Sequence, residues 1–314
     1  MKKTGLLLLL LAAAAVAQQV DPTTPAGIVA TNGNVPIGRY QTPTAADLYC
    51  AGFISKERLP DAKFVSGGLQ TPNTTKFTNG EMVYLSGGGY QQGQEFTIVR
   101  ELRDVNEYEF FEGQRRLINN SGHPYSEVGR VRVLDARSRN AVAEVEFSCD
   151  PINPGDVAVP FVEKAPIAFH PPVHLDRFAP PNGKLTGRIL LGKDFDGTLG
   201  TGGKVYLNFG SNQGTKVGDY FRAVRPYNLD LKDPVDSLSF KESTSEDTQK
   251  NLPTFEAKRW TRTKGPNIHV ADLPRRAVGE VVILTVSPTT STGMIVFALE
   301  DIHPGDAVEL DEQQ

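Results

Sequence analysis

Residues 128–156 read VGRVRVLDARSRNAVAEVEFSCDPINPGD, and residues 278–306 read VGEVVILTVSPTTSTGMIVFALEDIHPGD. Each residue of the second stretch lies 150 positions after its counterpart in the first, with no gap from the opening Val-Gly to the closing Pro-Gly-Asp. Two runs upstream recur in the same order, Val-Tyr-Leu at 83 and 205 and Gly-x-x-Phe-x-x-Val-Arg at 93 and 218. An internal duplication of this kind predicts two tandem copies of one structural module.

The recurring runs are short, rich in β-branched residues and alternate between apolar and polar positions. Gly, Asn, Asp and Pro separate them, which is typical of strands that bury one face. Each copy is expected to supply about five strands, and so few short strands bury a common face by curling into a small barrel or sandwich. The predicted fold is mostly β, with two tandem small five-stranded barrel-like or sandwich-like modules and little helix.

Composition divides the chain into five parts. The N-terminal part has a positive start, an apolar run and an Ala15-Val16-Ala17 cleavage signal, which predicts a secretory signal peptide. The expected parts are a signal peptide at 1–17, an irregular N-terminal arm and extension at 18–80, β-module 1 at 81–161, a Pro-rich linker at 162–184, and β-module 2 at 185–311 with a long insertion at 226–277.

The leader predicts a periplasmic or secreted protein that is not an integral membrane protein, because its apolar run is too short to span a bilayer. Cleavage would remove Lys2 and Lys3 and move the formal net charge from −4 to −6. A mildly acidic exported chain lacks the basic bias of nucleic-acid-binding proteins. We therefore expect no nucleic-acid partner.

The chain has two cysteines, Cys50 and Cys149. In an oxidising compartment an even count suggests one bridge, which would tie the N-terminal segment to the first module. The alternative is that Cys149 is only a small core residue, because it continues the inward-facing register of Val145 and Phe147 and aligns with Leu299. The sequence leaves both interpretations open.

The Pro-Gly-Asp ends of the two copies look like turns whose role is geometric. Pro presets φ, Gly takes a positive φ, and Asp hydrogen-bonds its own backbone. We interpret Asp156 and Asp306 as turn residues, and the turn accounts for their recurrence. The copies share no His, Cys, Ser or paired carboxylate, so they are typical of modules that bind or assemble.

Asp194-Phe195-Asp196-Gly197-Thr198 resembles the first motif of haloacid dehalogenase phosphatases, in which two aspartates serve phosphoryl transfer and hold Mg²⁺. Those enzymes need a doubly wound α/β domain, whereas here a Gly-rich stretch leads into another strand. A Ca²⁺ site at the same aspartates is not predicted either, because the other loop ligands that Ca²⁺ needs are missing. His170 and His174 are interrupted by prolines, so no metal site is predicted there either.

The largest difference between the copies is a long insertion in the second. Fifty-two residues separate Arg225 from Val278, against 27 between Arg100 and Val128. The only tryptophan, Trp260, lies in this insertion among basic residues. A solvated loop with one anchoring aromatic is one interpretation. Because Trp and Arg are enriched at binding hot spots, the candidate binding residues are Arg259, Trp260 and Arg262.

The second copy is similar to the C-terminal module of the flagellar assembly protein T family, over residues 204–306, and the first copy matches it more weakly over 82–156. The positions that carry the resemblance are Val205, Leu207, Asn208, Gly210, Gly214, Gly218, Asp219, Phe221, Val224, Arg225, Gly279, Val281, Gly305 and Asp306. The first copy departs at Ser86, which stands where Asn208 does. The resemblance implies a small β-module of periplasmic proteins, used in envelope-associated assembly and without an active site.

We therefore expect a non-catalytic secreted or periplasmic binding or assembly protein of the cell envelope, with no cofactor. Its expected partner is an envelope protein or a peptidoglycan-associated structure. The alternative from another class is a metal-dependent phosphatase built on Asp194 and Asp196.

Overall fold

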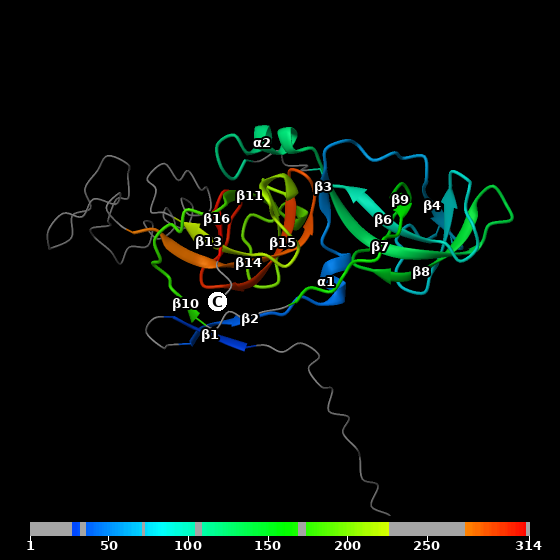
Figure 1. The fold of residues 1–314 in the computed structure, drawn as a ribbon. Helices are drawn as coiled ribbons and strands as arrows, with labels where there is room; N and C mark the ends of the chain where they lie inside the picture. Colours follow the sequence, from blue (N-terminus) through cyan, green and yellow to red (C-terminus); the bar gives the residue numbers. More distant parts are fainter. Residues whose placement is uncertain are drawn as a thin grey trace, which may run out of the picture.

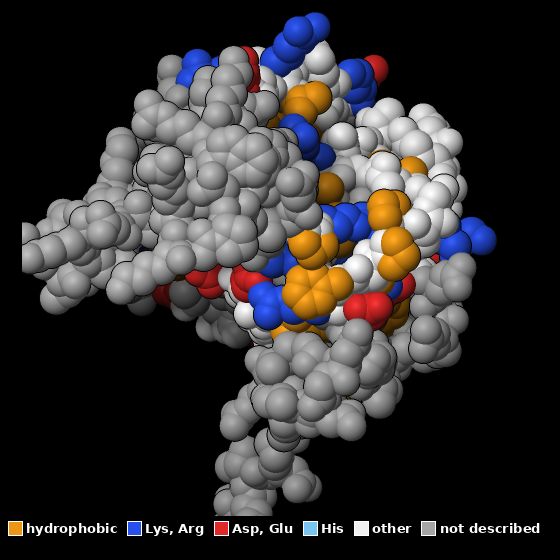
Figure 2. Space-filling view, turned by 90° about the vertical axis from the view of Figure 1, so that its left-hand side faces the viewer, with side chains coloured by type: hydrophobic (Ala, Val, Ile, Leu, Met, Phe, Trp, Pro, Cys, Tyr) orange, Lys and Arg blue, Asp and Glu red, His pale blue; other side chains and the backbone are white. Residues whose placement is uncertain are grey.

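The structure is a computed structural model of two β-barrels side by side, with a small sheet below one of them (Figure 1). It describes residues 27–31, 36–70, 73–103, 109–168, 174–225 and 274–311. The proposed signal peptide at 1–17 lies outside the described residues. Figure 2 looks at the end of the molecule opposite the first barrel, where hydrophobic side chains lie among Lys and Arg side chains.

Barrel 1 is a closed ring of six antiparallel strands in the order β4-β5-β8-β7-β6-β9. Its strands are β4 (Phe64–Gly68), β5 (Met82–Ser86), β6 (Glu95–Glu101), β7 (His123–Asp135), β8 (Ala141–Ser148) and β9 (Val157–Pro160). A seventh strand, β3 (Phe53–Ser55), pairs with the start of β7 outside the ring.

Barrel 2 repeats the same ring, in the order β11-β12-β15-β14-β13-β16. Its strands are β11 (Thr186–Gly192), β12 (Lys204–Leu207), β13 (Tyr220–Arg225), β14 (Arg276–Val286), β15 (Ser291–Ala298) and β16 (Ala307–Leu310). The β-bulges also recur, for example between Arg130 and Val131 in β7 and between Glu280 and Val281 in β14.

The prediction of a mostly β fold with two tandem small barrels is confirmed. Each barrel has six strands rather than five, because one strand precedes the Val-Tyr-Leu run in each copy. In barrel 1 this strand is β4, which lies within the arm and extension expected at 18–80. Its sequence, FVSGG, has two glycines, and a bulge between Val65 and Gly67 breaks its alternation. The alternation of apolar and polar residues that marks a strand is therefore too short to detect in the sequence.

The glycine of the recurring Val-Gly pair lies where the backbones of two neighbouring strands approach each other closely. A Cβ added to Gly129 would lie 2.6 Å from the carbonyl oxygen of Phe147, and one added to Gly279 would lie 2.5 Å from that of Phe297. Ile152 and Ile302 close on the same two glycines from inside their barrels. The duplicated Val-Gly therefore marks a close approach between neighbouring strands in each barrel.

The N-terminal segment supplies most of the remaining elements. A three-stranded sheet joins β1 (Gly27–Thr31), β2 (Pro36–Tyr40) and the short strand β10 (His174–Leu175). The helix α1 (Ala45–Tyr49) follows, and Thr44 and Asp47 form a capping box at its start. The other short elements are the helix α2 (Gln114–Ser121) and the 3₁₀ turns η1 (Lys193–Phe195) and η2 (Ser211–Gln213).

Residues 44–59, which we call the seam segment, lie between the two barrels. Leu48 and Ala51 pack on the outer face of barrel 2 against Val282 and Leu284. Ile54 packs on a second outer cluster that contains Tyr206. Part of the expected N-terminal arm and extension is thus a packed layer, since it covers the apolar outer face of barrel 2.

Hydrogen bonds hold the seam segment to both barrels. The Gly52 amide donates to Glu127 of barrel 1 at 3.0 Å. The Gly52 carbonyl accepts from the hydroxyls of Thr285 and Thr292 of barrel 2 at 3.4 and 3.0 Å. Lys164, at the start of the Pro-rich linker, donates to both carboxylate oxygens of Glu127 at 2.7 Å. The linker therefore begins as a docked segment.

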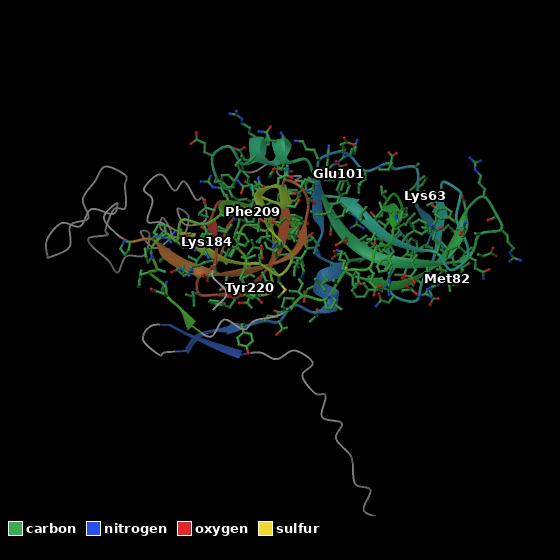
Figure 3. The ribbon with its side chains drawn as sticks, viewed as in Figure 1. Lys63, Met82, Glu101, Lys184, Phe209 and Tyr220 are labelled. Atoms are coloured by element: carbon green, nitrogen blue, oxygen red, sulfur yellow. A yellow bond between two sulfur atoms is a disulfide. The ribbon has the colours of Figure 1, made fainter. Side chains whose placement is uncertain are left out.

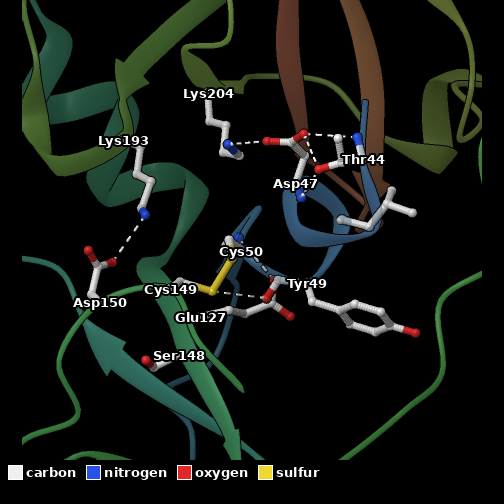
Figure 4. The surroundings of a disulfide bond; sticks show 12 residues. Thr44, Asp47, Tyr49, Cys50, Glu127, Ser148, Cys149, Asp150, Lys193 and Lys204 are labelled. Atoms are coloured by element: carbon white, nitrogen blue, oxygen red, sulfur yellow. Dashed lines mark hydrogen bonds and ion pairs between the residues drawn. A yellow bond between two sulfur atoms is a disulfide. The ribbon is translucent and has the colours of Figure 1, made fainter. Parts of the chain in front are cut away.

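Cys50 and Cys149 form a disulfide, with their Cα atoms 5.7 Å apart (Figure 4). The bridged interpretation is confirmed, and the bond joins the seam segment to barrel 1. Two ion pairs flank it: Asp47 with Lys204 at 2.9 Å and Asp150 with Lys193 at 3.1 Å. Both pairs reach barrel 2, so the region around the disulfide connects all three parts of the molecule.

Candidate binding site at the barrel junction

The predicted binding residues Arg259, Trp260 and Arg262 lie outside the described residues. The structure places the ends of their insertion, because β13 ends at Arg225 and β14 begins at Arg276. The expected insertion boundary at 277 therefore overlaps the first two residues of a strand. His170 and the side chain of His174 also lie outside the described part.

Asp194 and Asp196 follow β11, which is a strand of an antiparallel closed barrel. The doubly wound sheet of a haloacid dehalogenase phosphatase does not form around them. Burial raises the pKa of Asp194, and nearby Asp150 and Asp196 raise it further while Lys193 opposes them. Among the described residues, no group of three or more His, Cys, Asp or Glu side chains is placed to hold a metal ion.

The aspartates of the two Pro-Gly-Asp turns do more than shape the turn. Asp156 accepts two hydrogen bonds from Arg100, at 2.8 and 2.6 Å, and Asp306 accepts two from Arg225, at 2.7 and 2.6 Å. Turn geometry alone therefore does not account for their recurrence. The sequence carries a signal for this pairing, because Arg100 and Arg225 occupy the same place in the recurring Gly-x-x-Phe-x-x-Val-Arg run.

The connection between β6 and β7 crosses from barrel 1 to barrel 2. Residues 109–122, which we call the strap, include α2 and lie over barrel 2 (Figure 1). Phe110 packs against Gly197, where an added Cβ would lie 2.1 Å from its ring. Gln114 is 3 % exposed, accepts from the Phe110 amide at 2.7 Å and donates to the Leu190 carbonyl at 2.7 Å. The strap thus packs on the neighbouring barrel and is hydrogen-bonded to it.

A cavity of about 350 Å³ lies beneath the strap, at the junction where Figure 3 labels Glu101. Leu102, Ile118 and Phe195 give it apolar walls, and these side chains pack on the buried cluster between the barrels. The polar residues that line it are Glu101, Glu109, Gln114, Arg115, Asn119 and His123. Apolar walls with a few polar groups are typical of small-molecule and peptide-binding sites.

Phe195 enters the cavity from a strained turn. It has φ 61°, and so does Asp194 before it. Non-glycine residues in the left-handed region cost free energy and persist only where surrounding contacts fix them. The Asp-Phe-Asp run that resembled a catalytic motif therefore serves to present an aromatic ring at the junction. Apart from its unusual composition, nothing in the sequence signals this role.

Glu101 organises the charges at the cavity rim. It accepts from Arg58 at 2.7 Å and from Arg103 at 3.2 Å, and it contacts Nδ1 of His123 at 3.0 Å. Burial raises the pKa of Glu101, but these hydrogen bonds outweigh it, so the pKa lies below its usual value. Glu101 is therefore a fixed anion at neutral pH.

The fold and the cavity define a tandem β-barrel protein with a candidate binding site where its barrels meet. No protein-family model matches the chain, and no curated protein matches it. Within the described ranges, no helix is long and apolar enough to cross a membrane.

Proposed function

We propose that this protein is a non-catalytic binding or assembly protein of the cell envelope, acting in the periplasm or after secretion. Its partner is an envelope protein or a peptidoglycan-associated structure. The disulfide supports an oxidising compartment, because such bonds persist there and are rare in the cytosol. The resemblance of residues 204–306 to the flagellar assembly protein T module supports an envelope role, and these residues run from the start of β12 to the turn that precedes β16.

The observation that carries the proposal is the cavity at the barrel junction. Its walls come from both barrels and from the strap, and the seam segment fixes the barrels through the Cys50–Cys149 bond and through hydrogen bonds to each side. A site held in this way loses little conformational freedom on binding, which favours affinity. The arrangement suits recognition of a partner group rather than its chemical conversion.

The test is affinity capture from a solubilised envelope fraction with matched variants. Asn119→Trp places a large side chain at the cavity from the exposed face of α2 and should abolish specific capture. Leu134→Trp, at a position 37 % exposed on β7, is the control and should capture as the wild type does. Equal capture by both variants would contradict the proposal. Magnesium-dependent phosphatase activity lost in Asp194→Asn would replace it with the enzymatic alternative.

A further inference from the structure

A second cleft, of about 310 Å³, adjoins the first on the other side of Glu101. Three arginines line it: Arg58, Arg100 and Arg103. Half-buried Leu59 and Val157 add apolar surface. We call it the arginine cleft.

Because the two barrels are copies of one module, the arginine cleft of barrel 1 has an equivalent position in barrel 2. In barrel 2 that position is covered. The Arg225–Asp306 pair is sealed in barrel 2, with side chains 5 % and 4 % exposed. Phe111 of the strap covers the adjoining turn, where a Cβ on Gly305 would lie 2.8 Å from its ring. In barrel 1 the equivalent Arg100 is 33 % exposed. A Cβ on the equivalent Gly155 would meet no described atom within 4 Å.

The arginines that line this opening keep unused donors. Arg58 and Arg103 each donate to Glu101 through Nη2, and their side chains are 60 % and 72 % exposed. Arg100 donates through Nε and Nη2, and its Nη1 has no hydrogen-bond partner among the described residues. A guanidinium presents five N–H donors in a planar fork that matches a carboxylate. Three such forks around one opening can bind a further carboxylate.

The balance of charges in the cleft restricts the kind of ligand that it can bind. Asp61, Glu101 and Asp156 also line the cleft, so three carboxylates offset three guanidinium groups. A balanced cleft has no strong long-range attraction for a polyanion. It suits a single carboxylate on an otherwise neutral molecule, with an apolar group against Leu59 and Val157. Phe111 already places an apolar group beside the corresponding glycine of barrel 2.

We propose that the arginine cleft binds a peptide C-terminal carboxylate whose last residue has an apolar side chain. This proposal rests on the proposed function and names the chemistry of its partner. The carboxylate contacts the forks of Arg58 and Arg103 and the remaining Nη1 donor of Arg100. The last side chain lies beside Gly155.

The test is a calorimetric titration of the full-length protein with N-acetyl-alanyl-alanine, which has a free carboxylate, and with its C-terminal amide. The acid should bind saturably and the amide at least about tenfold more weakly, since a charge-assisted bidentate contact is lost. Arg58→Gln and Arg103→Gln should each weaken the acid by a similar factor. Both residues are exposed, so each variant should keep the wild-type thermal midpoint. Arg137→Gln, an exposed arginine paired with Asp135, is the control and should not change binding.

Three outcomes would overturn the assignment: no saturable binding of the acid, equal binding of acid and amide, or inorganic phosphate binding as tightly as the acid. Arg103→Lys keeps the charge but not the fork, so binding unchanged in this variant would also count against it. The envelope capture with Asn119→Trp depends on the other cavity. Failure of the titration with that capture result intact would remove this proposal alone, whereas failure of both would remove the proposed function as well.

Discussion

The pairs Arg100–Asp156 and Arg225–Asp306 occupy equivalent positions in the two barrels, but they differ in their exposure to solvent. In each barrel the aspartate also accepts from a backbone amide of its own turn, that of Asn153 or His303. The arginine therefore fixes this turn to its own strand, β6 in barrel 1 and β13 in barrel 2. The pair in barrel 2 is sealed from solvent, whereas Arg100 in barrel 1 reaches water.

Arg225→Gln should therefore destabilise the protein much more than Arg100→Gln. Removing one partner of a buried pair leaves an uncompensated charge and costs about 3–5 kcal/mol. The partly exposed pair can regain water, and its loss should cost roughly 1–3 kcal/mol. Urea denaturation followed by circular dichroism measures both variants against the wild type. Equal losses would show that exposure does not distinguish the pairs.

Glu280 is a buried carboxyl on the outer side of barrel 2. Its side-chain atom Oε2 has no hydrogen-bond partner among the described residues, and the residue is 6 % exposed. Burial raises the pKa of Glu280 to about 8, with Asp311 raising it further and Arg222 opposing. The folded protein therefore keeps a proton that the unfolded chain loses near 4.5.

This raised pKa predicts a stability that falls with pH. The contribution of Glu280 is fully present below the unfolded value and is lost as pH rises through about 8, because the folded state binds the extra proton in that window. Glu280→Gln mimics the protonated form, so its thermal midpoint should exceed that of the wild type by more at pH 9 than at pH 5. Glu57→Gln, at an exposed position, is the control. A constant difference across this range would contradict the prediction.

At the scale of elements, one connection has different roles in the two copies. The chain between β6 and β7 forms the strap that crosses to barrel 2. The chain between β13 and β14 is the long insertion, and it leaves barrel 2 from the equivalent ring position. Copy one closes its ring with the shorter connection, so the extra length is not needed to close a barrel.

Trp260→Ala remains a test of whether this insertion binds a partner. An aromatic anchor flanked by arginines is typical of a hot spot, and its truncation should weaken retention by envelope material by about 2 kcal/mol. The thermal midpoint should stay nearly unchanged. Phe178→Ala, which removes a side chain that is 56 % exposed, is a matched aromatic control. A lower thermal midpoint with retention intact would make Trp260 a structural anchor instead.

The disulfide joins one short element to a barrel across a sequence separation of 99 residues. Closing a loop of that length stabilises a protein by roughly 2–4 kcal/mol. The Cys50→Ala, Cys149→Ala double variant should lose about that much in denaturation experiments. Mass spectrometry of the exported wild type should find no alkylatable thiol. Free thiols there would show that the bond does not form after export.

At the scale of the whole molecule, the seam segment makes the two barrels one unit. It contributes apolar contacts to barrel 2 through Leu48 and Ala51 and a disulfide to barrel 1 through Cys50. Tyr206 of barrel 2 also donates to the Tyr125 carbonyl of barrel 1 at 3.2 Å. The Pro-rich linker at 162–184 is therefore not the only connection between the modules.

A protease site introduced at 169–173 tests this arrangement. After cleavage, the two fragments should elute together in size-exclusion chromatography and keep the β circular dichroism of the intact protein, because the buried seam remains. Urea should then separate them, and each fragment is expected to refold as a β-module on its own. Separation of the fragments without denaturant would show that the seam contributes little to their association.

The two β-modules are predictable from the sequence alone, because a duplication and a period of two are local signals. The sequence also carried a clue that barrel 2 is covered, since 281–284 reads VVIL where copy one reads VRVL at 131–134. Val281 and Ile283 point into the barrel, and Val282 and Leu284 lie under the seam segment. What covers that outer face depends on contacts between residues far apart in the chain. Such contacts leave no periodic trace, so the strap and the two cavities are seen only in the tertiary structure.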